Sequence, residues 1–147
     1  MQDRLTKERR SWNMSRIRGK DTSPEKRVRS ALHRMGYRFR LHRKDLPGNP
    51  DIVFVSNRVA LFVHGCFWHR HRGCKNCTTP TYRRKFWVNK LEGNATRDKR
   101  NRLALRKRGW KTFVIWECQT EDSHRLTRAI ESFITVGCLL SAPNQEK

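Results

Sequence analysis

Hydrophobic residues recur along the chain in short, bounded segments that predict alternating helices and strands. Between Asp21 and Gly36, apolar residues at positions 28, 31, 32 and 35 follow the helical repeat, after a start that contains hydroxyls, a proline and a glutamate. Hydroxyls cap helix N-termini, proline is tolerated in the first turn, and glutamate is favoured at the positive end of the helix dipole. We therefore expect one helix of about 13 residues with a single apolar face.

Three segments have the pattern of β-strands. Residues 51–55 and 58–63 are mostly apolar, and Ser56 and Asn57 join them as a short polar connection that suits a hairpin. Before them, Tyr37, Phe39 and Leu41 alternate with polar residues and lead into a turn at 46–50. Residues 110–116 are almost continuously apolar, which favours a central strand.

The remaining segments predict helices and one long loop. Residues 83–108 are helical in composition, with Gly93 as an expected break, and apolar positions 126, 129, 130 and 133 mark a closing helix. Residues 64–82 hold His, Cys, Gly and Pro without a period, so something other than packing must hold that loop. The order of elements predicts an α/β fold in which helices flank a mixed central sheet.

One domain accounts for the length of 147 residues and the mass of 17.6 kDa. We assign residues 21–137 to it. Residues 1–20 are basic with few apolar positions and are expected to be an arm that orders on binding, whereas 138–147 show no pattern. The mean hydropathy of −0.92 would suit disorder, but five Trp, seven Phe and two Tyr argue for a buried core.

The charge of the chain indicates a polyanionic partner. Lys and Arg number 34 against 13 Asp and Glu, which gives a net charge of +21 and a pI of about 11.2. This excludes an acidic small-molecule enzyme and favours nucleic acid, with an anionic membrane surface as the lesser alternative. The longest apolar run has five residues and the first residues do not resemble a signal peptide, so we expect a cytoplasmic protein without a membrane segment.

The first candidate metal-binding residue is a carboxylate at the start of a predicted strand. Asp51 follows Pro50, and the neighbouring strand ends at Val63 and His64. A carboxylate near a main-chain carbonyl offers the hard oxygen ligands that Mg²⁺ prefers, and Glu25 could add a third oxygen. A Pro-Asp pair before a strand is more often only a turn, so the residues alone leave both interpretations open.

Cysteine and histidine concentrate in the 64–82 loop. Sulfur and imidazole together form a Zn²⁺ ligand set, and four-coordinate closure would fasten the loop to the sheet. Five Cys without an export signal argue against a disulfide framework, and a buried free thiol fits Cys138 best. Spacing favours a Cys74-x-x-Cys77 pair, whereas the alternative set would tie the loop to the last strand: Cys66, His71, Cys74 and Cys118.

Imidazoles and large rings share the same loop. His64, Phe67, Trp68 and His69 lie within six positions. Neutral imidazoles can accept or donate a proton near pH 7, and large rings on a loop are either buried or stacked on bases. A purely structural histidine is the commoner case, so the residues alone do not decide for catalysis.

Four segments carry a resemblance to a known family: 13–22 (NMSRIRGKDT), 46–51 (LPGNPD), 63–69 (VHGCFWH) and 116–118 (WEC). In this order and spacing, the chain resembles the very short patch repair endonucleases, the Vsr family, over roughly residues 9 to 120. The resemblance implies a core like that of type II restriction endonucleases. It also implies a bacterial, nucleoid-associated monomer that nicks duplex DNA 5′ to the T of a T·G mismatch left by deamination of 5-methylcytosine, with mismatch-repair proteins as further partners.

The resemblance further implies a role for each matching residue. Asp51 would bind catalytic Mg²⁺ together with the main-chain carbonyl of Val63, where family members often carry Thr. His69 would transfer a proton, supported by Glu25 and His64. Structural Zn²⁺ would be bound by Cys66, His71, Cys74 and Cys118, with Cys77 as an extra thiol. The residues in contact with DNA would be Phe67, Trp68 and Trp87 as a wedge beside the mismatch, and Met14 and Ile17 across the opposite groove.

The chain departs from the restriction enzymes at the residues that would activate the attacking water. Restriction enzymes usually carry Glu-x-Lys on the second strand, where this chain has Phe62-Val63-His64. The departure argues against Lys-assisted activation of water and agrees with imidazole as the base. Two alternatives to a nicking enzyme are a zinc-stabilised module that binds distorted DNA without cutting it, and a small restriction endonuclease that cuts both strands. Only an enzyme requires Asp51, His64 and His69 to converge.

Overall fold

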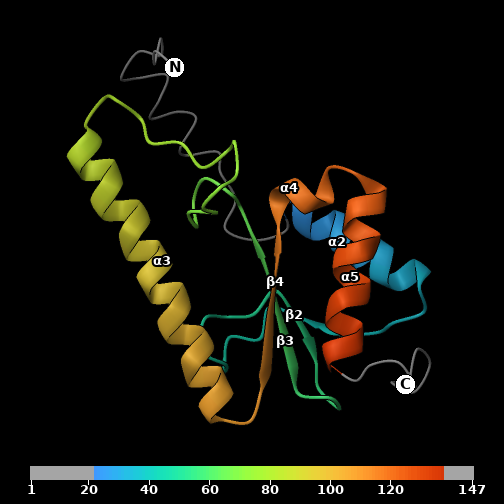
Figure 1. The fold of residues 1–147 in the computed structure, drawn as a ribbon. Coiled ribbons are helices and arrows are strands. Elements are labelled where there is room, and N and C mark those ends of the chain that lie inside the picture. Colours follow the sequence, from blue (N-terminus) through green and yellow to red (C-terminus); the bar gives the residue numbers. More distant parts are fainter. Residues whose placement is uncertain (1–21, 138–147) are drawn as a thin grey trace.

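A computed structural model describes residues 22–137 and shows a mixed sheet with helices on both faces (Figure 1). The predicted arm with Met14 and Ile17, and the tail 138–147, lie outside the described residues. The elements follow the chain as α2 (Ser23–Arg34), β1 (Arg40–Leu41), β2 (Ile52–Phe54), β3 (Val59–His64), α3 (Arg84–Lys107), β4 (Lys111–Trp116), α4 (Glu117–Thr120) and α5 (Ser123–Gly137). The predicted α/β class is thus confirmed.

Local signals place the first helix where the sequence predicts it. The Thr22 hydroxyl accepts a hydrogen bond from the Glu25 N–H at 3.4 Å, and a proline lies in the first turn. Val28, Ala31 and Leu32 are buried on one face. The helix ends at Arg34, just before Gly36, whose φ of 94° suits a residue without a Cβ.

The sheet has the order β1-β2-β3-β4. The hairpin β2–β3 is antiparallel, as the sequence predicts, and β3 runs parallel to β4 with His64 opposite Trp116. Successive side chains of β3 face opposite sides of the sheet. Val59, Leu61 and Val63 pack with residues of α2 and α5, whereas Ala60 and Phe62 belong to a second core that includes Leu105 of α3. Two hydrophobic layers therefore enclose β3.

The expected central position of the last strand is wrong. In the described residues, β4 lies at the edge of the sheet beside β3. Its apolar character has another cause, because helices cover both of its faces. Phe113 and Ile115 pack in the core with α2 and α5, and Val114 packs in the core with α3.

The expected break at Gly93 is also wrong, since α3 runs unbroken through this position. Gly93 is exposed, and apart from its chain neighbours and the backbone of its own helix no heavy atom lies within 4 Å of where its Cβ would stand. A glycine within a helix costs only about 1 kcal/mol relative to alanine, which burial of Trp87, Leu91 and Leu105 along α3 readily offsets. None of the helices in residues 22–137 is long and apolar enough to cross a membrane.

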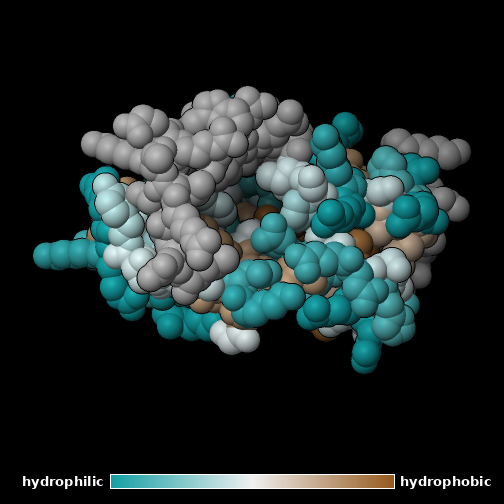
Figure 2. All heavy atoms as spheres, turned by 90° about the horizontal axis from the view of Figure 1, so that it is seen from above, coloured by the Kyte–Doolittle hydropathy of each residue, from teal (hydrophilic) through white to brown (hydrophobic). Residues whose placement is uncertain are grey.

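The parallel pairing of β3 and β4 brings the ends of both strands to one end of the molecule. The 64–82 loop and α4 leave the sheet there, at the top of Figure 1. Figure 2 shows this end from above, where hydrophilic residues surround a hollow in which more apolar residues are visible.

Candidate active site

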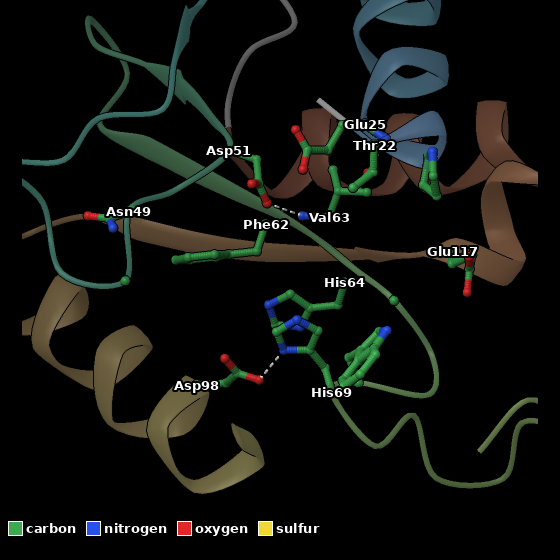
Figure 3. Close-up of a pocket in the computed structure, with 14 residues that line it drawn as sticks. Thr22, Glu25, Asn49, Asp51, Phe62, Val63, His64, His69, Asp98 and Glu117 are labelled. Atoms are coloured by element: carbon green, nitrogen blue, oxygen red, sulfur yellow. Dashed lines mark hydrogen bonds and ion pairs between the residues drawn. The ribbon is translucent and has the colours of Figure 1, made fainter. Parts of the chain in front are cut away.

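The end of β3 forms the floor of a cavity of about 530 Å³. Asp51 precedes β2, and the Val63 N–H donates a hydrogen bond of 2.7 Å to Asp51 Oδ2. Because side chains alternate along β3, Val63 faces α2 whereas His64 faces α3. Figure 3 accordingly shows the carboxylates of Asp51 and Glu25 on one side of the strand and a histidine pair on the other, around the same cavity.

Asp51 is a poorly solvated carboxyl group. Its pKa is raised to about 7, chiefly by burial and further by the nearby Glu25 carboxylate, although the hydrogen bond from the Val63 N–H and the charges of His42 and His69 act in the opposite direction. A desolvated carboxylate gains more from a nearby cation than an exposed one does. Its position therefore fits a group that binds a hard divalent cation.

Glu25 is buried at the first turn of α2, where it lies close to Asp51. The Arg29 guanidinium donates to Glu25 Oε2 at 2.9 Å, and His42 Nε2 lies 3.8 Å from the same oxygen. One ligand atom from each of Glu25, His42 and Asp51 can be chosen so that all lie within 4.8 Å of one another. His42 was not singled out from the sequence, where an isolated histidine in a basic turn carries no signal.

The histidine pair occupies the α3 side of the cavity. The rings of His64 and His69 stack with centroids 4.0 Å apart and planes at 8°. His69 Nδ1 lies 2.6 Å from Asp98 Oδ2, so the imidazole donates to the carboxylate and its Nε2 is left to act on a substrate. Burial, and next the charge of His69, lower the pKa of His64 to about 3, so His64 is neutral at pH 7.

Asp98, like His42, is a site residue that the sequence did not single out. It belongs to α3, 29 positions after His69. A signal was available: Glu92 and Asp98 are the only acidic residues of a helix that is otherwise crowded with Lys and Arg. An acidic residue on such a surface opposes the binding of DNA phosphates, so its presence indicates a specific role.

Three cysteines and one histidine meet beside the histidine pair. The Sγ atoms of Cys66 and Cys118 both lie 3.5 Å from His71 Nδ1, and the ligand atoms of these residues and Cys74 all lie within 4.8 Å of one another. A tetrahedral zinc site with Zn–S of about 2.3 Å and Zn–N of about 2.0 Å would separate sulfur and nitrogen by about 3.5 Å. Of the two ligand sets left open by the sequence, the structure groups the one that includes Cys118, and Cys77 is not in the group.

A row of aromatic rings connects this Cys/His group to the histidine pair. His71 stacks on Trp116 at 4.2 Å and 5°, and Trp116 meets His64 edge to face at 5.3 Å. His64 in turn stacks on His69. Through Trp116 and His64, the Cys/His group is therefore in contact with His69, the imidazole that is paired with Asp98.

The proposed wedge residues form one aromatic cluster. Phe67 and Trp68 of the loop lie 5.7 and 5.9 Å from Trp87 of α3, measured between ring centroids. Trp87 is 7% exposed, whereas Phe67 and Trp68 are half-buried. Asn94 of α3 donates to the Trp68 carbonyl at 3.1 Å, which fixes the loop against the helix.

Comparisons with known proteins identify the family. Residues 2–76 match the family described as DNA mismatch endonuclease Vsr. The chain is 52% identical to the type II nicking enzyme V.XorIIP of Xanthomonas oryzae pv. oryzae, over 91% of this chain and 98% of the relative. It is 40% identical to the DNA mismatch endonuclease Vsr of Escherichia coli, over 86% and 81% of the two chains.

A solved structure shares the fold. The catalytic domain of the homing endonuclease I-Bth0305I superposes with a TM-score of 0.53 at 23% identity and covers 80% of this chain and 98% of that domain. The two sequence relatives go further than this similarity of fold, because each matches more than four fifths of the chain at 40% identity or more. The chain belongs to the Vsr family of DNA mismatch endonucleases.

Proposed function

We propose that the protein nicks one strand of duplex DNA 5′ to the T of a T·G mismatch that arises when 5-methylcytosine is deaminated. The observation that carries the proposal is that Asp51 and the His64–His69 pair line the same cavity, in a chain of charge +21. A nicking enzyme and a mismatch endonuclease among the relatives support it. The proposal includes a restriction-enzyme-like core, a monomer acting at the bacterial nucleoid, and mismatch-repair proteins as further partners.

The donor set at the cavity fits Mg²⁺. Asp51 uses one carboxylate oxygen for the Val63 N–H, and its other oxygen and the Val63 carbonyl are hard ligands. We propose that these two hold the ion; when bound, it would stabilise charge on the phosphate and lower the pKa of a water. Asp98 orients His69 for proton transfer, and the ring of neutral His64 stacks on the ring of His69. The charge of Glu25 makes an ionised Asp51 less favourable when no cation is bound.

The Cys/His group is proposed to bind structural Zn²⁺. Burial raises the pKa of the Cys66 thiol to about 12 and also raises that of Cys118, so these thiols stay protonated unless a cation replaces the protons. The four donors then would close a site that joins the loop to the end of β4.

A binding module without catalysis is the less favoured alternative. Such a module needs the basic surface and the aromatic cluster, but it does not need the Asp51 carboxylate in the same cavity as two imidazoles. A restriction endonuclease that cuts both strands is a third candidate, which no contact in the described residues favours over nicking.

The proposed function predicts a single product from a defined strand. Duplexes that carry T·G, other mismatches or only matched pairs would be labelled on either strand and incubated with Mg²⁺ or EDTA. We expect cleavage of the T strand alone, immediately 5′ to the mismatched T, and only with Mg²⁺. Tight binding without cleavage in Mg²⁺ would instead support the binding module, and cleavage of both strands in matched DNA would support a restriction enzyme.

The wedge hypothesis predicts that Trp68→Ala loses selectivity rather than stability. Separating base steps costs a few kcal/mol, and less at a mismatch, so an inserted ring converts weak pairing into preference. We expect a Tm near that of the parent and an equal affinity for T·G and matched duplexes. Trp110→Ala is the control, because Trp110 is half-buried like Trp68 but packs against the core beside α3, so its loss should lower the Tm without changing the preference. A strongly destabilised Trp68→Ala that retains the preference would overturn the hypothesis.

A further inference from the structure

A second cavity of about 310 Å³ adjoins the first on the α3 side. The two cavities share His64, His69 and Asp98, so the histidine pair separates the Asp51 side from a region lined by the loop and by α3. Four cationic side chains line this second cavity: Arg70, Arg72, Lys99 and Arg102. Its four cationic side chains and its position beside His69 distinguish it from the rest of the basic surface.

The charges in the second cavity are only partly neutralised. Glu92 pairs with both Arg70 and Arg72 at 3.3 Å, and Asp98 is occupied by His69. Among residues 22–137, neither Lys99 nor Arg102 has a hydrogen-bond or salt-bridge partner. Arg102 is close enough to the histidine pair for its charge to disfavour protonation of His64. Two cations without a partner among the described residues thus line one cavity.

We propose that Lys99 and Arg102 bind a backbone phosphate of the nicked strand, next to the phosphate that is cut. The inference rests on the proposed function. If the scissile phosphate lies between Asp51 and His69, the strand continues past the shared histidines into the second cavity. A guanidinium and an ammonium bind phosphate oxygens through charge-assisted hydrogen bonds. Such a contact fixes the strand relative to His69 without reading its sequence.

The alternative is that Lys99 and Arg102 are ordinary solvated charges, and α3 provides a matched control for it. Arg100 is an exposed cation of the same helix that lines neither cavity. Arg100→Gln removes the same charge as Arg102→Gln from a neighbouring position. Any effect of net charge alone will therefore appear in both variants.

The first test measures binding, so it does not depend on nicking. The affinity for T·G and matched duplexes would be measured in EDTA at several salt concentrations. Loss of one phosphate contact lowers the slope of log K against log [salt] by about 1. We expect this decrease for Arg102→Gln and for Lys99→Gln, equally on both duplexes, and no change for Arg100→Gln. Equal slopes for all three variants and the parent would overturn the proposal.

The second test locates the phosphate. Single methylphosphonate linkages, which carry no charge, would be placed in turn at positions flanking the cut. In the parent we expect one position next to the cut at which the KM for nicking rises about tenfold, the equivalent of about 1.4 kcal/mol. At that position Arg102→Gln should show no further loss, whereas Arg100→Gln should lose as much as the parent. Equal losses in all three proteins at every position would contradict the assignment.

The two tests separate failure of this inference from failure of the proposed function. If the parent does not nick a T·G duplex, the proposed function is wrong, and the salt slopes still decide whether the cavity binds phosphate. If the parent nicks but the slopes are unchanged, only the assignment of Lys99 and Arg102 is wrong.

Discussion

We expect the Asp51→Asn substitution to abolish nicking and to leave the binding of mismatched DNA intact. The amide keeps the size of the carboxyl group and one oxygen that can accept the Val63 N–H, which lies 2.7 Å from Oδ2 in the parent. It loses the charge that a divalent cation requires, and loss of one comparable transition-state contact costs a factor of 10² to 10³. We therefore expect the nicking rate to fall by about 10³ or more, measured in single turnover, at an unchanged Kd for T·G duplex. A rate near that of the parent would exclude Asp51 as the metal ligand.

Stability shows whether the variant has simply unfolded. Burial raises the pKa of Asp51 to about 7, above the value of about 3.9 for an unfolded aspartate. Folding therefore favours the protonated form, and the parent loses stability as the pH rises from about 4 to about 7. Without metal, Asp51→Asn should equal the parent near pH 4 and exceed it at pH 8 by up to about 4 kcal/mol. Thermal melts in EDTA at both pH values test this.

An exposed carboxylate provides the matched control for the change of charge. Asp45 lies in the turn before β2, and the Arg43 guanidinium pairs with it at 2.7 Å and holds its pKa low, at about 2. Asp45→Asn alters the net charge by the same amount outside the cavity. It should nick at the rate of the parent, and a comparable loss of rate in this variant would assign the effect of Asp51→Asn to charge alone.

Cys118→Ser is expected to lose bound zinc and melt earlier than the parent, whereas Cys77→Ser should do neither. Cys118 Sγ lies 3.5 Å from His71 Nδ1, and the Cys118 N–H lies 3.4 Å from Cys66 Sγ. A closed structural site contributes its binding free energy to folding. We expect the Tm to fall by roughly 10 °C or more, since each kcal/mol corresponds to roughly 2–8 °C in a domain of this size.

Elemental analysis of the purified variants, together with their melting curves, tests the ligand set. Cys77 is the matched control, because it is a half-buried thiol of the same loop outside the group of four. Zinc lost from Cys77→Ser but retained by Cys118→Ser would mean that the assignment is wrong. Nicking should fall with the zinc, since His71 stacks on Trp116 and Trp116 contacts His64.

Elements whose signals are local were predictable from the sequence. The start of α2 follows from the Thr22 cap and the proline, and its buried face follows from the spacing of apolar residues. The β2–β3 hairpin and α5 likewise correspond to the predicted segments. Caps, turns and periodicity act between residues a few positions apart, so the sequence displays them directly.

The two wrong predictions, a central last strand and a helix break at Gly93, used a local sequence pattern to infer how distant segments pack. The apolar pattern at 110–116 reflects the covering of both faces of β4, but it does not show whether β4 is a central or an edge strand. Gly93 lowers helix propensity locally, yet contacts made by Trp87 and Leu105 at distant points of α3 outweigh it. In both cases, packing between distant segments decided the outcome.

The sequence by itself determined which side chains are available for chemistry: the carboxylate at a strand mouth, the histidine pair and a loop rich in cysteine. Only the tertiary structure decided which of them meet. The parallel pairing of β3 and β4 brings Cys118 to Cys66 across 52 positions, where Cys77 was the nearer candidate, and the packing of α3 brings Asp98 to His69. Separation along the chain says little about distance in space, because the energy of forming the sheet and burying α3 exceeds the modest entropy cost of closing the loops between these residues.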